Sequence, residues 1–247
     1  MELLSSIFTL STAQTALELG CVYALVALAL FLSYSILNIA DLSTDGCFTL
    51  GCAVCCQVTL MGHPFLGLLA AMAAGVLSGY ITAFLQTRLG VESILAGIIV
   101  NTGLYTINLM AMGFSSTLSV FKCDTIFSLA KSALSGVLGG ALAGWSKLLV
   151  AAVIALTVAL LLTWFLKTRL GLSIRATGDS PDMIRASSVN PAFTITVGLC
   201  ISGSLTALSG AVLAQYQKSC DINLGTGMVT IALASLIIGE TLVGKGG

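Results

Sequence analysis

Charged residues are what this 247-residue chain has least of: Asp, Glu, Lys and Arg make up 8 % of it, whereas a soluble domain carries about 25 %. Long stretches contain none of them, at residues 19–40, 46–87, 93–121, 148–166, 186–217 and 222–239. A helix needs about 20 apolar residues to cross the hydrocarbon core of a membrane. With 57 % hydrophobic residues and a mean hydropathy of +1.06, the chain is predicted to be an all-α, polytopic transmembrane helical bundle.

The residues of an enzyme's active site are also missing. The formal net charge is zero, so nothing in the composition suggests binding to nucleic acid or to an acidic partner. The chain has one His, no phosphate-binding loop and no spaced carboxylate pair, so we predict no catalytic site and no cofactor. Any ATP hydrolysis that drives this protein is expected to take place on another chain.

Eight cysteines are the unusual part of the composition. Cys52, Cys55 and Cys56 have the close spacing of a metal cluster, but they lie in a charge-free run, and the single His is His63. Cysteine is also a small apolar residue that fits between packed helices. We therefore expect these thiols to pack between helices, and we predict no metal site.

The charge-free runs divide into about seven membrane spans. Pro64 splits the longest run, because Pro cannot continue a helix and suits its first turn. The segment 114–147 contains a part rich in Gly and Ala that is too short to span, and we expect an external amphipathic helix or a re-entrant piece there. The whole chain, residues 1–247, is predicted to form one transmembrane domain. The predicted spans are residues 14–37, 47–61, 65–86, 93–113, 148–166, 192–216 and 226–243.

Basic residues set the orientation, because they are enriched in cytoplasmic connections. Alternation of the spans places most of them on one face, which we predict to be cytoplasmic: Arg88, Lys167, Arg169, Arg175, Arg185 and Lys245. The N-terminus carries Glu2 and no basic residue, so it is expected outside. Because it also lacks the basic region of a signal peptide, the first span is expected to be retained in a multi-pass membrane protein.

The connection between the fifth and sixth spans, about residues 168–191, is the most informative polar segment. Ser180 followed by Pro181 is typical of a helix start, and Asn190 with its following Pro repeats the signal for the sixth span. The sequence therefore predicts a short cytoplasmic helix over residues 180–189. Two interpretations stay open: a well-capped connector in water, or a surface that binds a partner.

Acidic residues near the first span are candidates for a transport pathway. Asp41 and Asp45 follow that span in a stretch that begins at Asn38. The stretch is either a polar loop at the interface or a broken helix that lines a cavity away from lipid. Glu18 lies within the first span, where it either reaches the interface or faces the interior of the bundle.

Uncharged polar residues form a stripe on the fourth span. Asn101, Thr102, Tyr105 and Asn108 stand at positions i, i+1, i+4 and i+7, which lie along one helical face. A polar stripe on a membrane helix should face protein or water. It serves either hydrogen bonds between helices or a translocation pathway. The candidate pathway residues are thus Glu18, Asn38, Asp41, Asp45, Asn101, Tyr105 and Asn108.

Three stretches give the chain a family resemblance: residues 23–42, residues 175–190, and residues 208–217 followed by 225–228. On these residues the chain resembles the permease subunits of bacterial ABC importers related to branched-chain amino acid and ribose permeases. Within them it is similar to a subgroup of aromatic amino acid-type permeases. The resemblance implies that the short helix at 180–189 is the coupling helix, with contact residues Gly178, Asp179, Asp182 and Arg185.

The resemblance also implies the partners and the mechanism. They are an ATP-binding subunit, an extracytoplasmic substrate-binding lipoprotein and a second permease copy, with the pathway between two permeases in the bacterial plasma membrane. The transported solute is expected to be a small organic molecule, an amino acid. Relatives of this kind usually continue with a further span, so the chain is expected to lack a C-terminal span that they have.

Two other functions remain as alternatives. A stand-alone secondary transporter or channel would use Glu18, Asp41 or Asp45 as proton or ion sites. A membrane scaffold would transport nothing. Neither alternative requires an ATP-binding partner.

Overall fold

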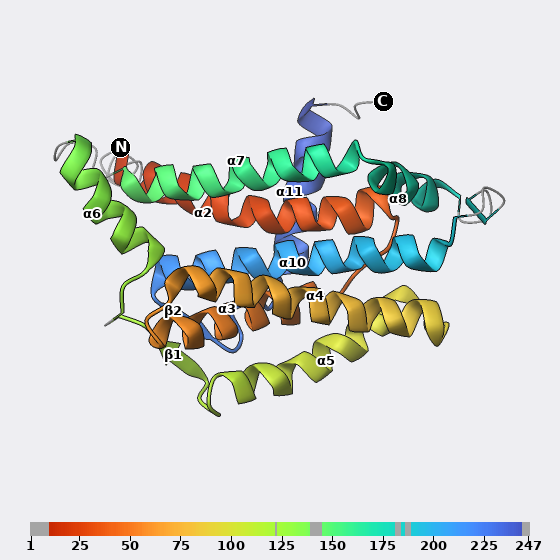
Figure 1. Cartoon of the computed structure of the whole chain (residues 1–247), viewed down its shortest axis with the longest axis horizontal. Coiled ribbons are helices and arrows are strands. Elements are labelled where there is room, and N and C mark those ends of the chain that lie inside the picture. The colour runs from red at the N-terminus through yellow and green to blue at the C-terminus, as the bar shows by residue number, and fades with distance from the viewer. Residues whose placement is uncertain (1–9, 122, 139–144, 181–183, 186–188, 244–247) are drawn as a thin grey trace, which may run out of the picture.

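The computed structural model of the chain describes residues 10–121, 123–138, 145–180, 184–185 and 189–243 (Figure 1). Five helical segments in this described part are long and apolar enough to cross a membrane. They are α2 (Leu10–Leu30) continued by the π-helix η1 (Phe31–Ile36), α4 (Pro64–Arg88), α5 (Ser93–Ala111), α7 (Ser146–Leu166) and α10 (Pro191–Gln217). The all-α prediction is confirmed.

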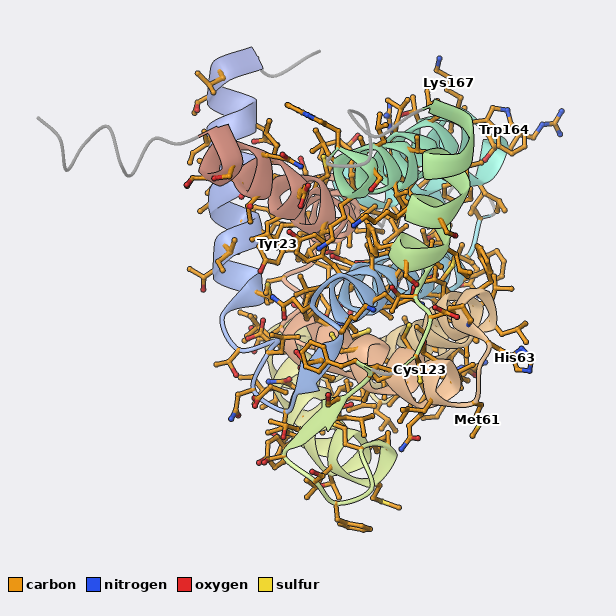
Figure 2. The ribbon with its side chains drawn as sticks, turned by 90° about the vertical axis from the view of Figure 1, so that its left-hand side faces the viewer. Tyr23, Met61, His63, Cys123, Trp164 and Lys167 are labelled. Atoms are coloured by element: carbon orange, nitrogen blue, oxygen red, sulfur yellow. The ribbon has the colours of Figure 1, made fainter. Side chains whose placement is uncertain are left out.

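Two shorter apolar helices complete the predicted set, α3 (Thr44–Leu60) and α11 (Met228–Val243). Each of the seven predicted stretches is therefore helical. The spanning helices run side by side along the long axis of the molecule, but α11 crosses that axis (Figures 1 and 2). The last predicted stretch is thus an apolar helix, as expected. Its orientation across the other helices could not be predicted from hydropathy.

The first span ends at Ile36, and a non-helical segment connects it to α3. Residues 37–43 have no helical structure, and they run from the end of η1 back to the middle of the bundle, where α3 begins (Figure 1). Asn38 starts the return with a φ of 55°. The freed backbone is satisfied locally, because Leu37 N–H donates to Leu32 O at 3.1 Å and Ile39 N–H donates to Ser33 O at 2.9 Å.

Helix α10 is the centre of the bundle, packed between α3, α4 and α2. Glycines allow this packing: a Cβ at Gly75 of α4 would overlap the carbonyl oxygen of Gly203, and a Cβ at Gly79 would overlap that of Leu199. A Cβ at Gly51 of α3 would likewise overlap Ala207 O. Lipid tails are as apolar as these helices, so close backbone contact supplies the attraction that the hydrophobic effect does not.

The cysteines take part in the same packing. Cys52 and Cys55 of α3 are fully buried, and Cys56 is 1 % exposed. The Cys52 thiol donates to Gly210 O of α10 at 2.9 Å, and the Cys47 thiol donates to Gly203 O at 3.3 Å. These thiols lie between helices as small residues, as expected. Within the described residues, no group of three or more His, Cys, Asp or Glu side chains is placed to hold a metal ion.

Four elements outside the spans were predicted in part or missed. The 114–147 segment contains the helix α6 (Ile126–Leu138), which fits the amphipathic alternative, and the short strand β1 (Thr117–Ser119). The strand β1 pairs antiparallel with β2 (Ser219–Asp221), with Leu118 opposite Cys220. The connection after α7 forms the helix α8 (Arg169–Asp179), which was not predicted.

The helix predicted at 180–189 falls largely on residues 181–183 and 186–188, which lie outside the described part of the chain. Of the remainder, Ile184 and Arg185 are helical, and Ile184 N–H donates to Ser180 O at 3.3 Å. Ser180 itself ends α8. The separate helix α8 begins after Thr168, whose hydroxyl accepts a hydrogen bond from Gly171 N–H at 3.3 Å.

Close packing of α4 on α10 predicts the effect of a single methyl group. Gly75→Ala should lower the free energy of unfolding by about 1–3 kcal/mol, because the new Cβ meets backbone atoms of α10 that cannot move aside. The control is Gly103→Ala on α5, where a Cβ meets nothing within 4 Å and helix propensity gains up to about 1 kcal/mol. Thermal unfolding of the detergent-solubilised protein measures both. Equal midpoints for the two variants would contradict this packing.

Candidate functional site

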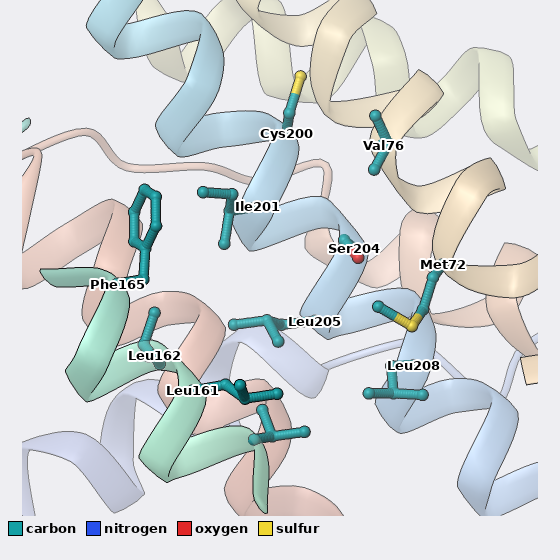
Figure 3. Close-up of a pocket in the computed structure, with 11 residues that line it drawn as sticks. Met72, Val76, Leu161, Leu162, Phe165, Cys200, Ile201, Ser204, Leu205 and Leu208 are labelled. Atoms are coloured by element: carbon teal, nitrogen blue, oxygen red, sulfur yellow. The ribbon is translucent and has the colours of Figure 1, made fainter. Parts of the chain in front are cut away.

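A polar cavity of about 320 Å³ lies between α3, α5 and the loop that leads into α11. It contrasts with the cavity in Figure 3, which lies between α4, α7 and α10 and has an apolar lining that includes Met72, Phe165 and Leu205. A polar cavity inside a membrane protein must face water, solute or protein. The residues that line the polar cavity are Asp45, Gly46, Thr49, Asn101, Thr102, Tyr105, Asn108, Ile222, Asn223 and Thr226.

The first wall is the start of α3, which follows the non-helical segment 37–43 and lies in the middle of the bundle. Asp45 lies in the first turn of α3, and its carboxylate accepts hydrogen bonds from Gly227 N–H at 3.0 Å and Val229 N–H at 2.9 Å. Thr49, one turn later, accepts from Gly225 N–H at 3.1 Å. Asp45 therefore caps the N-terminus of α11 and fixes the loop that forms the second wall.

The third wall is the polar stripe of α5. Asn101, Tyr105 and Asn108 all line the cavity, so the predicted common face is confirmed. Asn108 is 2 % exposed and donates through Nδ2 to Gly46 O at 3.1 Å, while its Oδ1 has no hydrogen-bond partner. Tyr105, between Asn101 and Asn108 in the stripe, is 52 % exposed. A Cβ at Gly46 would come within 2.6 Å of Asn101 Oδ1, so this glycine keeps α5 close to α3.

The remaining predicted pathway residues lie apart from the cavity. Glu18 is 3 % exposed and accepts from Tyr216 OH at 2.7 Å and from Gln14 Nε2 at 2.9 Å, so it faces the interior of the bundle. Asp41 is buried and accepts from the backbone N–H and the hydroxyl of Ser43, at 2.9 and 2.6 Å. Asn38 is exposed at the start of the return segment. The structure thus brings four of the seven candidates together: Asp45, Asn101, Tyr105 and Asn108.

Sequence reasoning missed three polar residues of the lining. Thr49 was hidden inside a run without charge, and Asn223 and Thr226 belong to a short loop between β2 and α11. A pattern of residues around a loop cannot show which distant helix the loop touches. The spacing of Thr49 one turn after Asp45 was the available signal, because it places both on one face of α3.

The segment expected to bind a partner begins with the end of α8, which packs against η1 at the end of the first span. A Cβ at Gly178 of α8 would overlap Ile36 O of η1, so Gly178 packs inward and Asp179 is exposed. Thr177 of α8 and Thr194 of α10 form a hydrogen bond of 2.8 Å between their hydroxyls. Arg185 is exposed, and Asp182 lies outside the described residues. Helix α8 lies at the same end of the molecule as the C-terminal end of α4 (Figure 1).

Known proteins are similar in sequence to this chain over most of its length. A family model described as branched-chain amino acid transport system / permease component matches residues 13–245. A tyrosine transport system permease protein of Clostridioides difficile is 32 % identical over 225 residues, which are 91 % of this chain and 71 % of that protein. A D-allose transport system permease protein of Escherichia coli is 31 % identical over 209 residues, 81 % of this chain and 59 % of that protein.

A guanosine ABC transporter permease protein of Bacillus subtilis is 30 % identical over 196 residues, which are 72 % of this chain and 57 % of that protein. No solved structure matches this chain. The relatives' names cover an amino acid, a sugar and a nucleoside, so the shared feature is transport of small polar solutes.

The two hydrogen bonds from the α11 N-terminus predict a local effect of Asp45. Asp45→Ala should accelerate hydrogen exchange at Gly227 and Val229, because loss of a helix cap costs about 0.5–2 kcal/mol. Asp45→Asn keeps one acceptor oxygen and should fall between this variant and the wild type. Asp124→Ala, which removes an exposed carboxylate that accepts from Ser128 on α6, is the control. Unchanged exchange at both amides in Asp45→Ala would show that the cap does not hold α11.

Proposed function

We propose that this chain, which belongs to the family of branched-chain amino acid transport system permease components, is the membrane-spanning subunit of a bacterial ABC importer. It moves a small organic solute, an amino acid, across the plasma membrane. The observation that carries the proposal is the polar cavity, because four predicted pathway residues from two helices meet there.

The proposed pathway needs a second permease copy. Thr102 and Tyr105 are exposed beside the cavity on α5, and a polar face of a membrane helix is unfavourable against lipid. A second copy that packs on this face would cover it and would close the cavity into a route between two subunits. An extracytoplasmic binding protein would deliver the solute at the outer end of that route.

The proposed site for the ATP-binding subunit is α8 with the residues that follow it. Asp179 and Arg185 are exposed there, and Gly178 seats α8 on η1. The segment that follows η1, residues 37–43, leads directly to the start of α3 at the cavity. A displacement of α8 would therefore reach the pathway through one continuous piece of chain.

The alternative of a stand-alone secondary transporter gains no support from its candidate ion sites. Glu18 and Asp41 lie apart from the cavity, and each is engaged in hydrogen bonds with nearby residues. Asp45 caps a helix. Ion-driven uptake by this chain alone in liposomes would favour that alternative over the importer.

Partner binding is tested on the proposed coupling residues. The double variant Asp182→Ala/Arg185→Ala should reduce the ATP-binding subunit that co-purifies with this chain and should reduce ATP-dependent uptake, because both charges are expected at the contact. Its matched control is Asp124→Ala/Lys131→Ala on and beside α6, which removes one charge of each sign away from that contact. Membrane insertion is measured for both. Full assembly and uptake in the first variant would remove the coupling assignment.

Transmission through η1 is tested at Gly178. Gly178→Ala should leave the complex assembled and ATP hydrolysis active, but it should lower the solute transported per ATP several-fold, because the new Cβ forces α8 away from Ile36. Gly20→Ala on α2, where a Cβ meets nothing within 4 Å, is the control. The ratio of uptake to hydrolysis in proteoliposomes is the readout. An unchanged ratio would argue against this route.

A further inference from the structure

The apolar cavity between α4, α7 and α10 has no part in the proposed pathway (Figure 3). Its volume is about 340 Å³. Helix α4 packs on α10 and α7 packs on α2, so the cavity separates α4 from α7. Leu205 and Leu208 of α10 are buried beneath it, whereas Val76 of α4 and Leu161 of α7 are exposed at its sides. The cavity therefore opens between two spanning helices, toward the membrane.

An apolar group has to fill this cavity in the membrane. A void would leave the atoms that line it without partners on one side, and their dispersion energy would be lost. Water is a poor occupant, because it needs two to four polar partners and the lining side chains are apolar apart from Ser204 and the thiol of Cys200. The lining runs along α7 from Val158 to Phe165, about 10 Å at the rise of an α-helix. A stretch of lipid acyl chain fits this length and this lining.

Two basic side chains lie where such an acyl chain would reach the membrane surface. Lys167 comes two residues after Phe165 of the lining, and Arg169 begins α8. Both are exposed, and neither forms an ion pair with another residue in the described part of the chain. Trp164 is exposed three residues before Lys167, and both side chains extend outward from the bundle (Figure 2). Because Trp is enriched at the membrane–water interface, this last turn of α7 is expected at the level of the lipid headgroups.

We propose that the cavity between α4, α7 and α10 binds one acyl chain of an anionic phospholipid, whose phosphate is held by Lys167 and Arg169. This end of α7 is the one that the basic residues predict to be cytoplasmic, and anionic lipids of the cytoplasmic leaflet attract basic residues beside a membrane span. A zwitterionic headgroup would bring its own cationic group close to these side chains and should bind less well. The ligand is a membrane lipid, so this site is separate from the proposed pathway.

Lipid retention by the full chain tests this site. The chain is purified in a mild detergent, stripped of lipid and titrated with phosphatidylglycerol or phosphatidylcholine of the same acyl chains, and native mass spectrometry measures the lipid bound. Phosphatidylglycerol should bind at least about fivefold more tightly, the factor that corresponds to about 1 kcal/mol for a basic side chain near the headgroup. Glycerol 3-phosphate, which has the phosphate and no acyl chain, should not displace it.

A charge variant tests the headgroup contact. Lys167→Gln should weaken phosphatidylglycerol about fivefold and leave phosphatidylcholine unchanged, because only the anionic headgroup loses an attraction. The matched control is Arg88→Gln, which removes one exposed positive charge from the same predicted face. Arg88 ends α4 about 18 Å along that helix beyond Val76 of the lining, so its loss should leave both lipids unaffected.

A cavity-filling variant tests the acyl-chain contact. Leu161→Trp places a larger side chain at the opening of the cavity, so it should weaken phosphatidylglycerol several-fold without a change of charge. The matched control is Leu160→Trp on the same helix, since Leu160 is 62 % exposed, Leu161 is 57 % exposed, and only Leu161 lines the cavity. If a variant does not fold, the comparison of the two lipids on the unmodified chain still decides the question.

Equal binding of phosphatidylglycerol and phosphatidylcholine by the unmodified chain would overturn the proposal. Full retention of phosphatidylglycerol in Leu161→Trp would also overturn it, because the lipid would then bind elsewhere. The measurement is repeated on the chain with any ATP-binding subunit that co-purifies. Loss of the lipid from that complex would show that a protein segment, and not an acyl chain, fills the cavity in the assembled transporter.

Discussion

Backbone contact between α3, α4 and α10 is the interaction on which the rest of this molecule depends. Lipid surrounds the bundle, so apolar side chains gain little when they leave it for another helix, and short-range packing has to hold the helices together. Gly75, Gly79 and Gly203 allow backbone atoms of α4 and α10 to touch, and Gly51 does the same for α3. These contacts place α10 in the centre, where 83 % of its apolar 18-residue spanning stretch is buried.

The position of the polar cavity follows from this packing. Because α3 is held against α10 along its length, its first turn lies in the interior of the bundle, and the chain must return from the end of η1 to reach it. Asp45 is therefore placed where it can cap α11, and Gly46 lies against the stripe of α5. Non-helical backbone is costly against lipid, and the part of this segment next to α3 is buried at Asp41 and Ser43.

Much of this could be predicted from the sequence, because lipid imposes a simple rule on composition. Charge-free runs identified the five spanning helices of the described part of the chain, and the spacing of Asn101, Tyr105 and Asn108 identified the polar face that lines the cavity. Contacts between distant segments could not be predicted: the pairing of β1 with β2 involves three-residue strands without a periodic signal. The helix α8 was missed because Thr168 is a weaker start signal than Ser180 with Pro181, although its hydroxyl does cap the helix.

Close contact at glycines also occurs at η1. This π-helix lies between the proposed site for the ATP-binding subunit at α8 and the segment that leads to the cavity. Leu37 lies between Gly178 of α8 and Gly198 of α10, both of which would overlap η1 or Leu37 if they carried a Cβ. On its other side, Ser35 of η1 donates to Glu240 of α11 at 3.0 Å. A single π-helical turn thus contacts α8, α10 and α11 while it is continuous with the segment that leads to Asp45. Since the packed helices resist deformation, a force applied to α8 would be relieved at this turn and at the irregular chain behind it, which is the chain that positions the cavity.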